Sequence, residues 1–158
     1  MPTIRAARQA DVPVILQLIH DLALYEREPD AVRNTAGSLD AALFGDRPTI
    51  YAHVAEDRGE VQGFALWFLN YSTWEGVNGI YLEDLYVRPE ARGAGHGKAL
   101  LANLARIATE RGYARVEWSV LNWNEPSIRF YESLGAAAQS EWSTFRLTGE
   151  ALADVAAL

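Results

Sequence analysis

A glycine-rich segment at residues 92–98 is the stretch of the sequence best suited to bind an anion. Residues 80–87 alternate apolar and acidic side chains and indicate a strand, which the Arg88-Pro89 pair closes. Residues 100–108 place leucine, isoleucine and alanine at the spacing of one helical face. Glycines let the backbone approach a ligand, and the first N–H groups of a helix point at it. The segment therefore predicts an anion site, with an unliganded glycine-rich turn as the alternative.

The spacing of the glycines separates three kinds of phosphate-binding loop. A P-loop requires G-x-x-x-x-G-K-[ST], but position 92 is arginine and position 99 is alanine. A dinucleotide fingerprint requires G-x-G-x-x-G, whereas Gly93, Gly95 and Gly97 recur at every second position. The remaining pattern, Arg-x-x-Gly-x-Gly with Arg92 as its first residue, resembles the pyrophosphate loop of the GNAT acyltransferases, which bind acetyl-CoA.

A second block, residues 121–131, reads Leu-Asn-Trp-Asn-Glu-Pro-Ser-Ile-Arg-Phe-Tyr and is followed by Leu-Gly-Ala at 134–136. Together with residues 81–84 and the glycine segment, it makes the chain similar to the diamine acetyltransferase branch of the GNAT superfamily. That branch includes spermidine/spermine acetyltransferase and its thialysine-acetylating relative. The resemblance covers nearly the whole chain. It implies one domain over residues 1–158, a three-layer α/β/α fold and a homodimer.

The resemblance also implies where acetyl-CoA binds. The backbone of one strand, the glycine segment and the start of a later helix would together hold the cofactor. The expected cofactor-binding residues are Leu85, Tyr86, Val87, Arg92, Gly93, Ala94, Gly95, His96, Gly97, Lys98, Asn124, Glu125, Pro126 and Ser127. The residues alone support the loop, because backbone donors at a helix start suit a diphosphate.

Acetyl transfer to an amine requires a group that removes a proton. A lysine-like amine has a pKa near 10.4, so making it neutral at pH 7 costs roughly 4.6 kcal/mol. A nearby carboxylate can hold the cation and relay its proton, and Glu83 matches the family's candidate. Strict strand alternation places Asp84 on the opposite face, so we expect only Glu83 to serve the site. A surface carboxylate or an ion pair is the alternative for Glu83.

The leaving thiolate needs a proton donor. A thiol near pKa 8.5 and a phenol near 10 are close enough for a positioned tyrosine to act as general acid. Tyr131 matches the family's donor, although helical spacing alone would make it a core aromatic residue. Backbone N–H groups of residues 85–87 are the expected oxyanion donors.

By resemblance, the acceptor amine would lie in an acidic and aromatic groove, which suits a small cation. The expected substrate-binding residues are Tyr25, Glu26, Trp74, Glu83, Glu117, Trp118, Ser119 and Glu141. Ser72 stands where the spermine-acetylating pattern prefers aspartate, which favours a shorter amine or a lysine analogue. The stretch between Gly135 and Trp142 is shortened against the family, which weakens the assignment of Glu141.

Composition excludes several other classes. The chain has 158 residues, 49% of them hydrophobic, and a formal net charge of −7, which argues against nucleic acid as a partner. There is no cysteine, so thiolate catalysis is absent, and the three scattered histidines predict no metal site. His96 is expected to be an exposed loop residue. Without a membrane-spanning run or a signal segment, we expect a cytoplasmic protein.

Propensity and periodicity predict an α+β chain whose largely antiparallel sheet feeds one strand–loop–helix unit. We expect strands at 3–7, 50–56, 61–70, 80–87, 114–121 and 142–147, a long loop at 71–79, and helices at 12–26, 39–44 and 126–135 besides the one after the glycine segment. Asp11 and Ser38 are candidate N-caps, and residues 152–158 suit a helical tail.

The leading hypothesis is an acetyl-CoA-dependent N-acetyltransferase that acts directly on a small cationic amine. Alternatives within the class are a protein N-terminus, a lysine side chain or an aminoglycoside as acceptor. Outside the class, a non-catalytic CoA-binding module is the alternative. The presence of both Glu83 and Tyr131 favours the enzyme.

Overall fold

The computed structural model describes residues 2–158 and separates into two compact units. The first unit ends at Ser119, and the second runs from Val120 to Leu158. Each unit is described by itself below. No helix among the described residues is long and apolar enough to cross a membrane.

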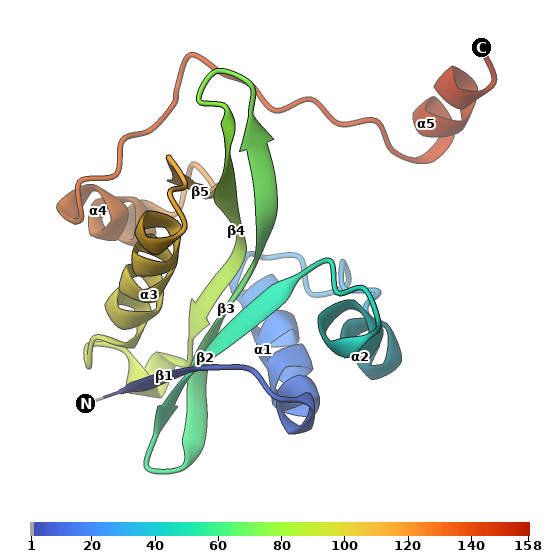
Figure 1. Cartoon of the computed structure of the whole chain (residues 1–158). Coiled ribbons are helices and arrows are strands. Elements are labelled where there is room, and N and C mark those ends of the chain that lie inside the picture. Colours follow the sequence, from blue (N-terminus) through green and yellow to red (C-terminus); the bar gives the residue numbers. More distant parts are fainter. Residues whose placement is uncertain (1) are drawn as a thin grey trace. The chain divides into compact units, whose positions relative to one another are not determined.

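The first unit is built on a five-stranded sheet with the order β1-β2-β3-β4-β5 (Figure 1). Neighbouring strands from β1 to β4 are antiparallel, and only β5 lies parallel to its neighbour β4. The strands are β1 (Thr3–Ala6), β2 (Tyr51–Asp57), β3 (Glu60–Ser72), β4 (Val77–Val87) and β5 (Val116–Glu117). A parallel pair needs a crossover, and α3 (His96–Glu110) provides it. The predicted α+β class and mixed, largely antiparallel sheet are confirmed.

Helices cover both faces of this sheet (Figure 1). The helices α1 (Val12–Tyr25) and α2 (Ala36–Phe44) pack on one face, and α3 lies across the other. The core under α1 and α2 consists of Val12, Ile15, Leu18, Leu39, Leu43, Ala52, Val54, Phe64, Leu66 and Tyr86. These residues alternate along the strands and recur at helical spacing along α1, as the sequence pattern predicts.

Two boundaries in the sheet differ from the predictions. The long loop predicted at 71–79 is wrong, because β3 continues to Ser72, β4 begins at Val77, and these two residues pair with each other. The remaining turn is short and contains Gly76 at φ 70°. The strand predicted at 114–121 is reduced to Val116–Glu117, the only residues there that pair with β4.

The helices α1 and α2 begin within a few residues of the predicted positions, but the residues that cap them differ from the predicted caps. The α1 helix begins directly after Asp11, yet the Asp11 carboxylate accepts hydrogen bonds from the Arg5 guanidinium at 2.7 and 3.0 Å instead of capping the helix. The α2 helix is capped by Thr35, whose Oγ1 accepts a hydrogen bond from the Ser38 backbone at 3.1 Å. Ser38 is therefore the residue that is capped and not the cap.

The second unit contains α4 (Glu125–Ser133) and α5 (Gly149–Ala156). Asn124 caps α4 by accepting a hydrogen bond from the Ser127 backbone at 3.4 Å, and Pro126 lies in the first turn, as predicted. The strand predicted at 142–147 is wrong, because no residue of that segment is in a strand. A strand forms only where a neighbour satisfies its backbone groups, and this unit provides none.

Candidate active site

The glycine segment forms a turn that leads directly into α3. Gly93 and Gly95 have φ values of 88° and 86°, a left-handed conformation that other residues adopt only with strain. Gly95 is the residue before the helix, and no side chain caps its first turn. The first backbone N–H groups of α3 are thus left to water or to a ligand, as an anion site requires.

The strand β4 has one edge that is open next to this turn. It pairs with β3 along its whole length, from Val77 to Val87. Its parallel pairing with β5 is confined to Ile80 and Tyr81, and beyond them no strand of the described chain lies on that edge. The backbone of residues 85–87 therefore faces an unfilled edge, which suits an extended ligand that adds to the sheet as a strand would. An extended thioester cofactor could lie along this edge, with its diphosphate at the adjoining turn.

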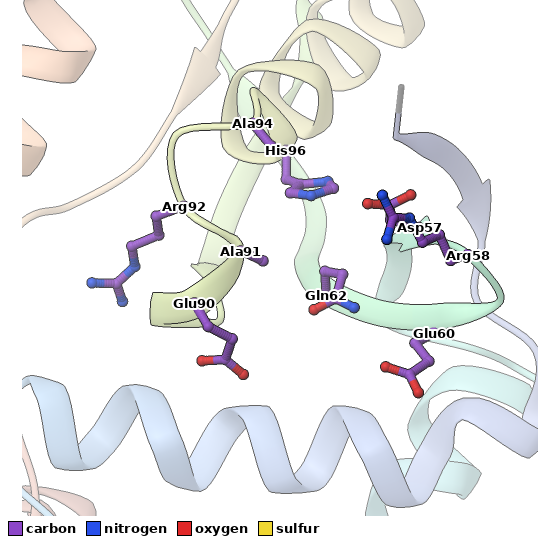
Figure 2. A pocket seen from close by; sticks show the side chains of 9 residues that line it. All are labelled: Asp57, Arg58, Glu60, Gln62, Glu90, Ala91, Arg92, Ala94 and His96. Atoms are coloured by element: carbon purple, nitrogen blue, oxygen red, sulfur yellow. The ribbon is translucent and has the colours of Figure 1, made fainter.

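His96 is buried, contrary to its predicted exposure on the loop. The residue is 3% exposed, and its Nδ1 atom has no hydrogen-bond partner among residues 2–158. Figure 2 shows the imidazole beneath the turn, on one wall of an open pocket of about 420 Å³ whose other walls include Gln62 and Glu90. The first residue of α3 is therefore a buried residue in the wall of this pocket. Lys98, in contrast, is exposed in the first turn of the helix.

A β-bulge changes the facing of the two carboxylates on β4. Leu66 pairs with Asp84, but the next residue, Trp67, pairs with Leu82, so Glu83 has no partner. Directly paired residues share a face, and Leu66 belongs to the core under α1 and α2, so Asp84 faces that side. Trp67 faces α3, where the Arg111 guanidinium lies 5.9 Å from its ring, and Leu82 shares that face.

Glu83 follows Leu82 and therefore faces the α1 side as well. The prediction that Glu83 and Asp84 lie on opposite faces is wrong, because it assumed unbroken alternation. Glu26, which follows the last residue of α1, completes a group of three carboxylates, called here the carboxylate trio: Glu26, Glu83 and Asp84.

The carboxylate trio is electrostatically coupled. Burial raises the pKa of Asp84 to about 7, and the negative charges of Glu83 and Glu26 add to the effect. Burial also raises the pKa of Glu26, with a further contribution from Glu83. Within residues 2–158, no arginine, lysine or histidine forms an ion pair with any of the three. A group of acids that is unpaired within the described part of the chain favours a cationic ligand, and one of its members, Asp84, has a pKa near neutral pH.

The other expected acceptor residues of the first unit lie elsewhere on it. Glu117 is in β5, where it accepts a hydrogen bond from the Asn70 amide at 3.3 Å and lies 3.8 Å from Arg115. Arg115 also donates to Ser72 at 3.0 Å, so Ser72 orders this network. Trp74 is 82% exposed in the turn between β3 and β4.

Tyr25 is the last residue of α1, and the remaining expected acceptor residues on the first unit are Trp118 and Ser119. Trp118 is half-buried after β5, and the Ser119 hydroxyl lies 2.9 Å from the Tyr81 hydroxyl. The structure therefore brings Glu26, Glu83 and Asp84 together and assigns Glu117 partners of its own.

The second unit carries the remaining predicted residues. Asn124 is buried, Glu125 and Pro126 are exposed in the first turn of α4, and Ser127 is half-buried. Tyr131 lies in α4 and is half-buried, with its ring centroid 5.5 Å from that of Phe130. Glu141 is exposed in the segment between α4 and α5.

Comparison with known proteins agrees with this geometry. Residues 15–136 match the Acetyltransferase (GNAT) family. The chain is 40% identical to a thialysine N-epsilon-acetyltransferase of Bos taurus, over 97% of this chain and 96% of that protein. It is 34% identical to the L-ornithine N5-acetyltransferase NATA1 of Arabidopsis thaliana, over 94% of this chain and 85% of that protein.

A solved structure shares the fold. The integron cassette protein VCH_CASS6, from the mobile metagenome of V. cholerae, superposes with a TM-score of 0.82 at 24% identity, over 98% of this chain and 97% of that one. The mixed sheet with its crossover helix is the fold that the two proteins share, and the family match over residues 15–136 identifies the class as an acetyltransferase.

The chain belongs to the GNAT acetyltransferase family, and within it to the diamine acetyltransferase branch predicted from the sequence. It is an N-acetyltransferase, and acetyl-CoA is the co-substrate that this family uses.

Proposed function

We propose that this enzyme transfers acetyl directly to a primary amine of a small polyamine or of a lysine analogue such as thialysine. The observation that carries the proposal is the carboxylate trio, two of whose members lie in β4, the strand expected to hold the cofactor. A cationic amine would neutralise a group of acids that forms no ion pair with the described residues.

The cofactor assignments rest on the open edge of β4 and on the glycine turn. Residues 85–87 would bind through their backbone, and the turn at 92–98 would hold the diphosphate. The role of residues 124–127 in cofactor binding follows from the resemblance to the family. Acetyl-CoA supplies the activated acyl group. The backbone N–H groups of β4 would stabilise the negative charge that develops on the acyl oxygen.

Glu83 and Asp84 would both take part in removing the proton from the amine, Glu83 by binding the ammonium and Asp84 by accepting the proton. Glu83 is exposed and would receive the ammonium first. Asp84 is more deeply buried, and its pKa of about 7 suits a base that accepts a proton at neutral pH and releases it through water. Tyr131 would then donate a proton to the departing thiolate.

A lysine-like acceptor is favoured over a long polyamine. The named relatives act on thialysine and on L-ornithine, both of which carry a primary amine at the end of a short chain. Ser72, which replaces the aspartate of the spermine-acetylating pattern, is hydrogen-bonded to Arg115 and offers no carboxylate for a second amine. Proteins and aminoglycosides are the alternative acceptors, and a homodimer without a metal is the expected active form.

A thiol-release assay with acetyl-CoA tests the proposal. The panel is thialysine, L-ornithine, lysine, spermidine, spermine, putrescine and an aminoglycoside. The highest kcat/KM is expected for thialysine or L-ornithine, and mass spectrometry of the product should locate the acetyl group on the terminal amine. Tight CoA binding without turnover of any amine would instead favour a non-catalytic CoA-binding module.

A further inference from the structure

One arginine connects the glycine turn to the end of α1. The Arg92 guanidinium lies 5.3 Å from the centroid of the Tyr25 ring and 5.4 Å from that of the Tyr86 ring. Its Nε donates a hydrogen bond to the Val87 carbonyl at 3.0 Å. Tyr25 is the last residue of α1, Tyr86 is buried in β4, and Arg92 precedes the glycine turn. A single side chain therefore contacts three elements of the site.

The other end of this guanidinium remains available. Arg92 is exposed, and no described residue accepts a hydrogen bond from either of its terminal nitrogens. An open pocket of about 380 Å³ adjoins it, lined also by Tyr25 and Tyr86. Figure 2 shows the Arg92 side chain directed away from His96. A planar guanidinium can stack on aromatic rings through its faces while its edge donates to a phosphate.

Tyr25 is followed immediately by Glu26, a member of the carboxylate trio. The ring that Arg92 contacts is thus adjacent in the chain to a carboxylate expected to receive the amine. A contact that holds the Tyr25 ring in place also holds the last turn of α1. It therefore sets the position of Glu26 relative to Glu83 and Asp84.

We propose that Arg92 is a positioning residue that couples the two substrates: with its guanidinium over the rings of Tyr25 and Tyr86, it holds the end of α1 in place for amine binding when a diphosphate occupies the glycine turn. The proposal rests on the proposed function, because it requires acetyl-CoA at the turn and an amine at the carboxylate trio. Coupling of this kind is reciprocal, so each substrate raises the affinity for the other.

The coupling is measured by calorimetry as the ratio of two dissociation constants for thialysine, one for the free protein and one for the protein saturated with CoA. A ratio of about 5 is expected for the wild type. Tyr25→Leu and Arg92→Lys should both reduce it to about 1, because each removes the stacking, and the double variant should show no further loss. Tyr25→Phe keeps the ring and should keep the ratio.

Arg88→Lys is the matched control. Arg88 lines the same pocket but donates to the Val61 carbonyl and stacks on neither ring, so its variant should retain the wild-type ratio. A wild-type ratio of 1 or below, or an unchanged ratio in Tyr25→Leu, would overturn the coupling while leaving the acetyltransferase activity standing. Failure to bind CoA at all would overturn the coupling and the proposed function together.

Discussion

Leu66 of β3 pairs with Asp84 of β4, although its neighbour Trp67 pairs with Leu82. The residue passed over is Glu83, and the resulting bulge turns two consecutive carboxylates to the same face of the sheet. That face also holds Glu26 at the end of α1. A local irregularity of one residue thus creates the acidic site at which we expect the amine to bind.

Asp84→Asn should stabilise the protein in a manner that depends on pH. The pKa of Asp84 is raised from 3.8 to about 7 in the folded state, mainly by burial. Folding is therefore favoured by its protonated form, and this contribution is complete below pH 4 and is lost as the pH rises to about 7. The asparagine variant should match the wild type near pH 4 and exceed its free energy of unfolding by up to about 4 kcal/mol above pH 7.

Urea unfolding followed by circular dichroism between pH 4 and pH 8 measures this difference. Asp154→Asn, in the exposed helix α5, is the surface control. A difference between Asp84→Asn and the wild type that stays constant with pH would show that the carboxylate does not titrate in this range.

Much of the site can be predicted from residue types and short spacings. The glycine pattern at 92–98 predicts the turn and the start of α3, because glycine is needed where φ is positive. The bulge is also visible in the sequence. The apolar residues alternate at Ile80 and Leu82, and the alternation resumes one position late, at Leu85 and Val87. That shift is the signal by which Asp84 could have been assigned to the face of Glu83.

Other features depend on partners far away in the sequence. No local pattern predicts that Glu26 lies opposite Glu83, because their approach requires α1 to pack on β4. The burial of His96 likewise depends on how the turn lies over β3. Residues 142–147 carry strand-forming side chains but have no neighbour in their unit to pair with, so propensity alone misassigned them.

Gly95→Ala should weaken both the fold and the cofactor site. At φ 86°, an added Cβ meets no neighbouring atom, so the cost is the strained backbone, about 1–2 kcal/mol. The KM for acetyl-CoA should rise because the first N–H groups of α3 shift. Gly37→Ala is the matched control, since Gly37 lies in the first turn of α2 without a positive φ and should be neutral or slightly stabilising. Equal effects on stability and on KM in both variants would count against the assigned role of the turn.

Tyr131→Phe should lower kcat by a factor on the order of 10², because the phenol that protonates the leaving thiolate is lost. The affinity for CoA, measured by calorimetry, should be nearly unchanged. Tyr71→Phe is the matched control, since Tyr71 is 62% exposed in β3 and has no assigned role. Wild-type turnover in Tyr131→Phe would remove Tyr131 from the mechanism.

The pH dependence of kcat/KM with thialysine, followed by thiol release, tests the carboxylate trio most directly. The wild type should show an acidic limb near pH 7, where Asp84 ionises. In Glu83→Gln this limb should move to lower pH, because removing a neighbouring negative charge lowers the pKa of Asp84. In Asp84→Asn the limb should disappear, with kcat/KM reduced by a factor on the order of 10². A limb that keeps the same midpoint in both variants would contradict the assignment of the amine proton to these carboxylates.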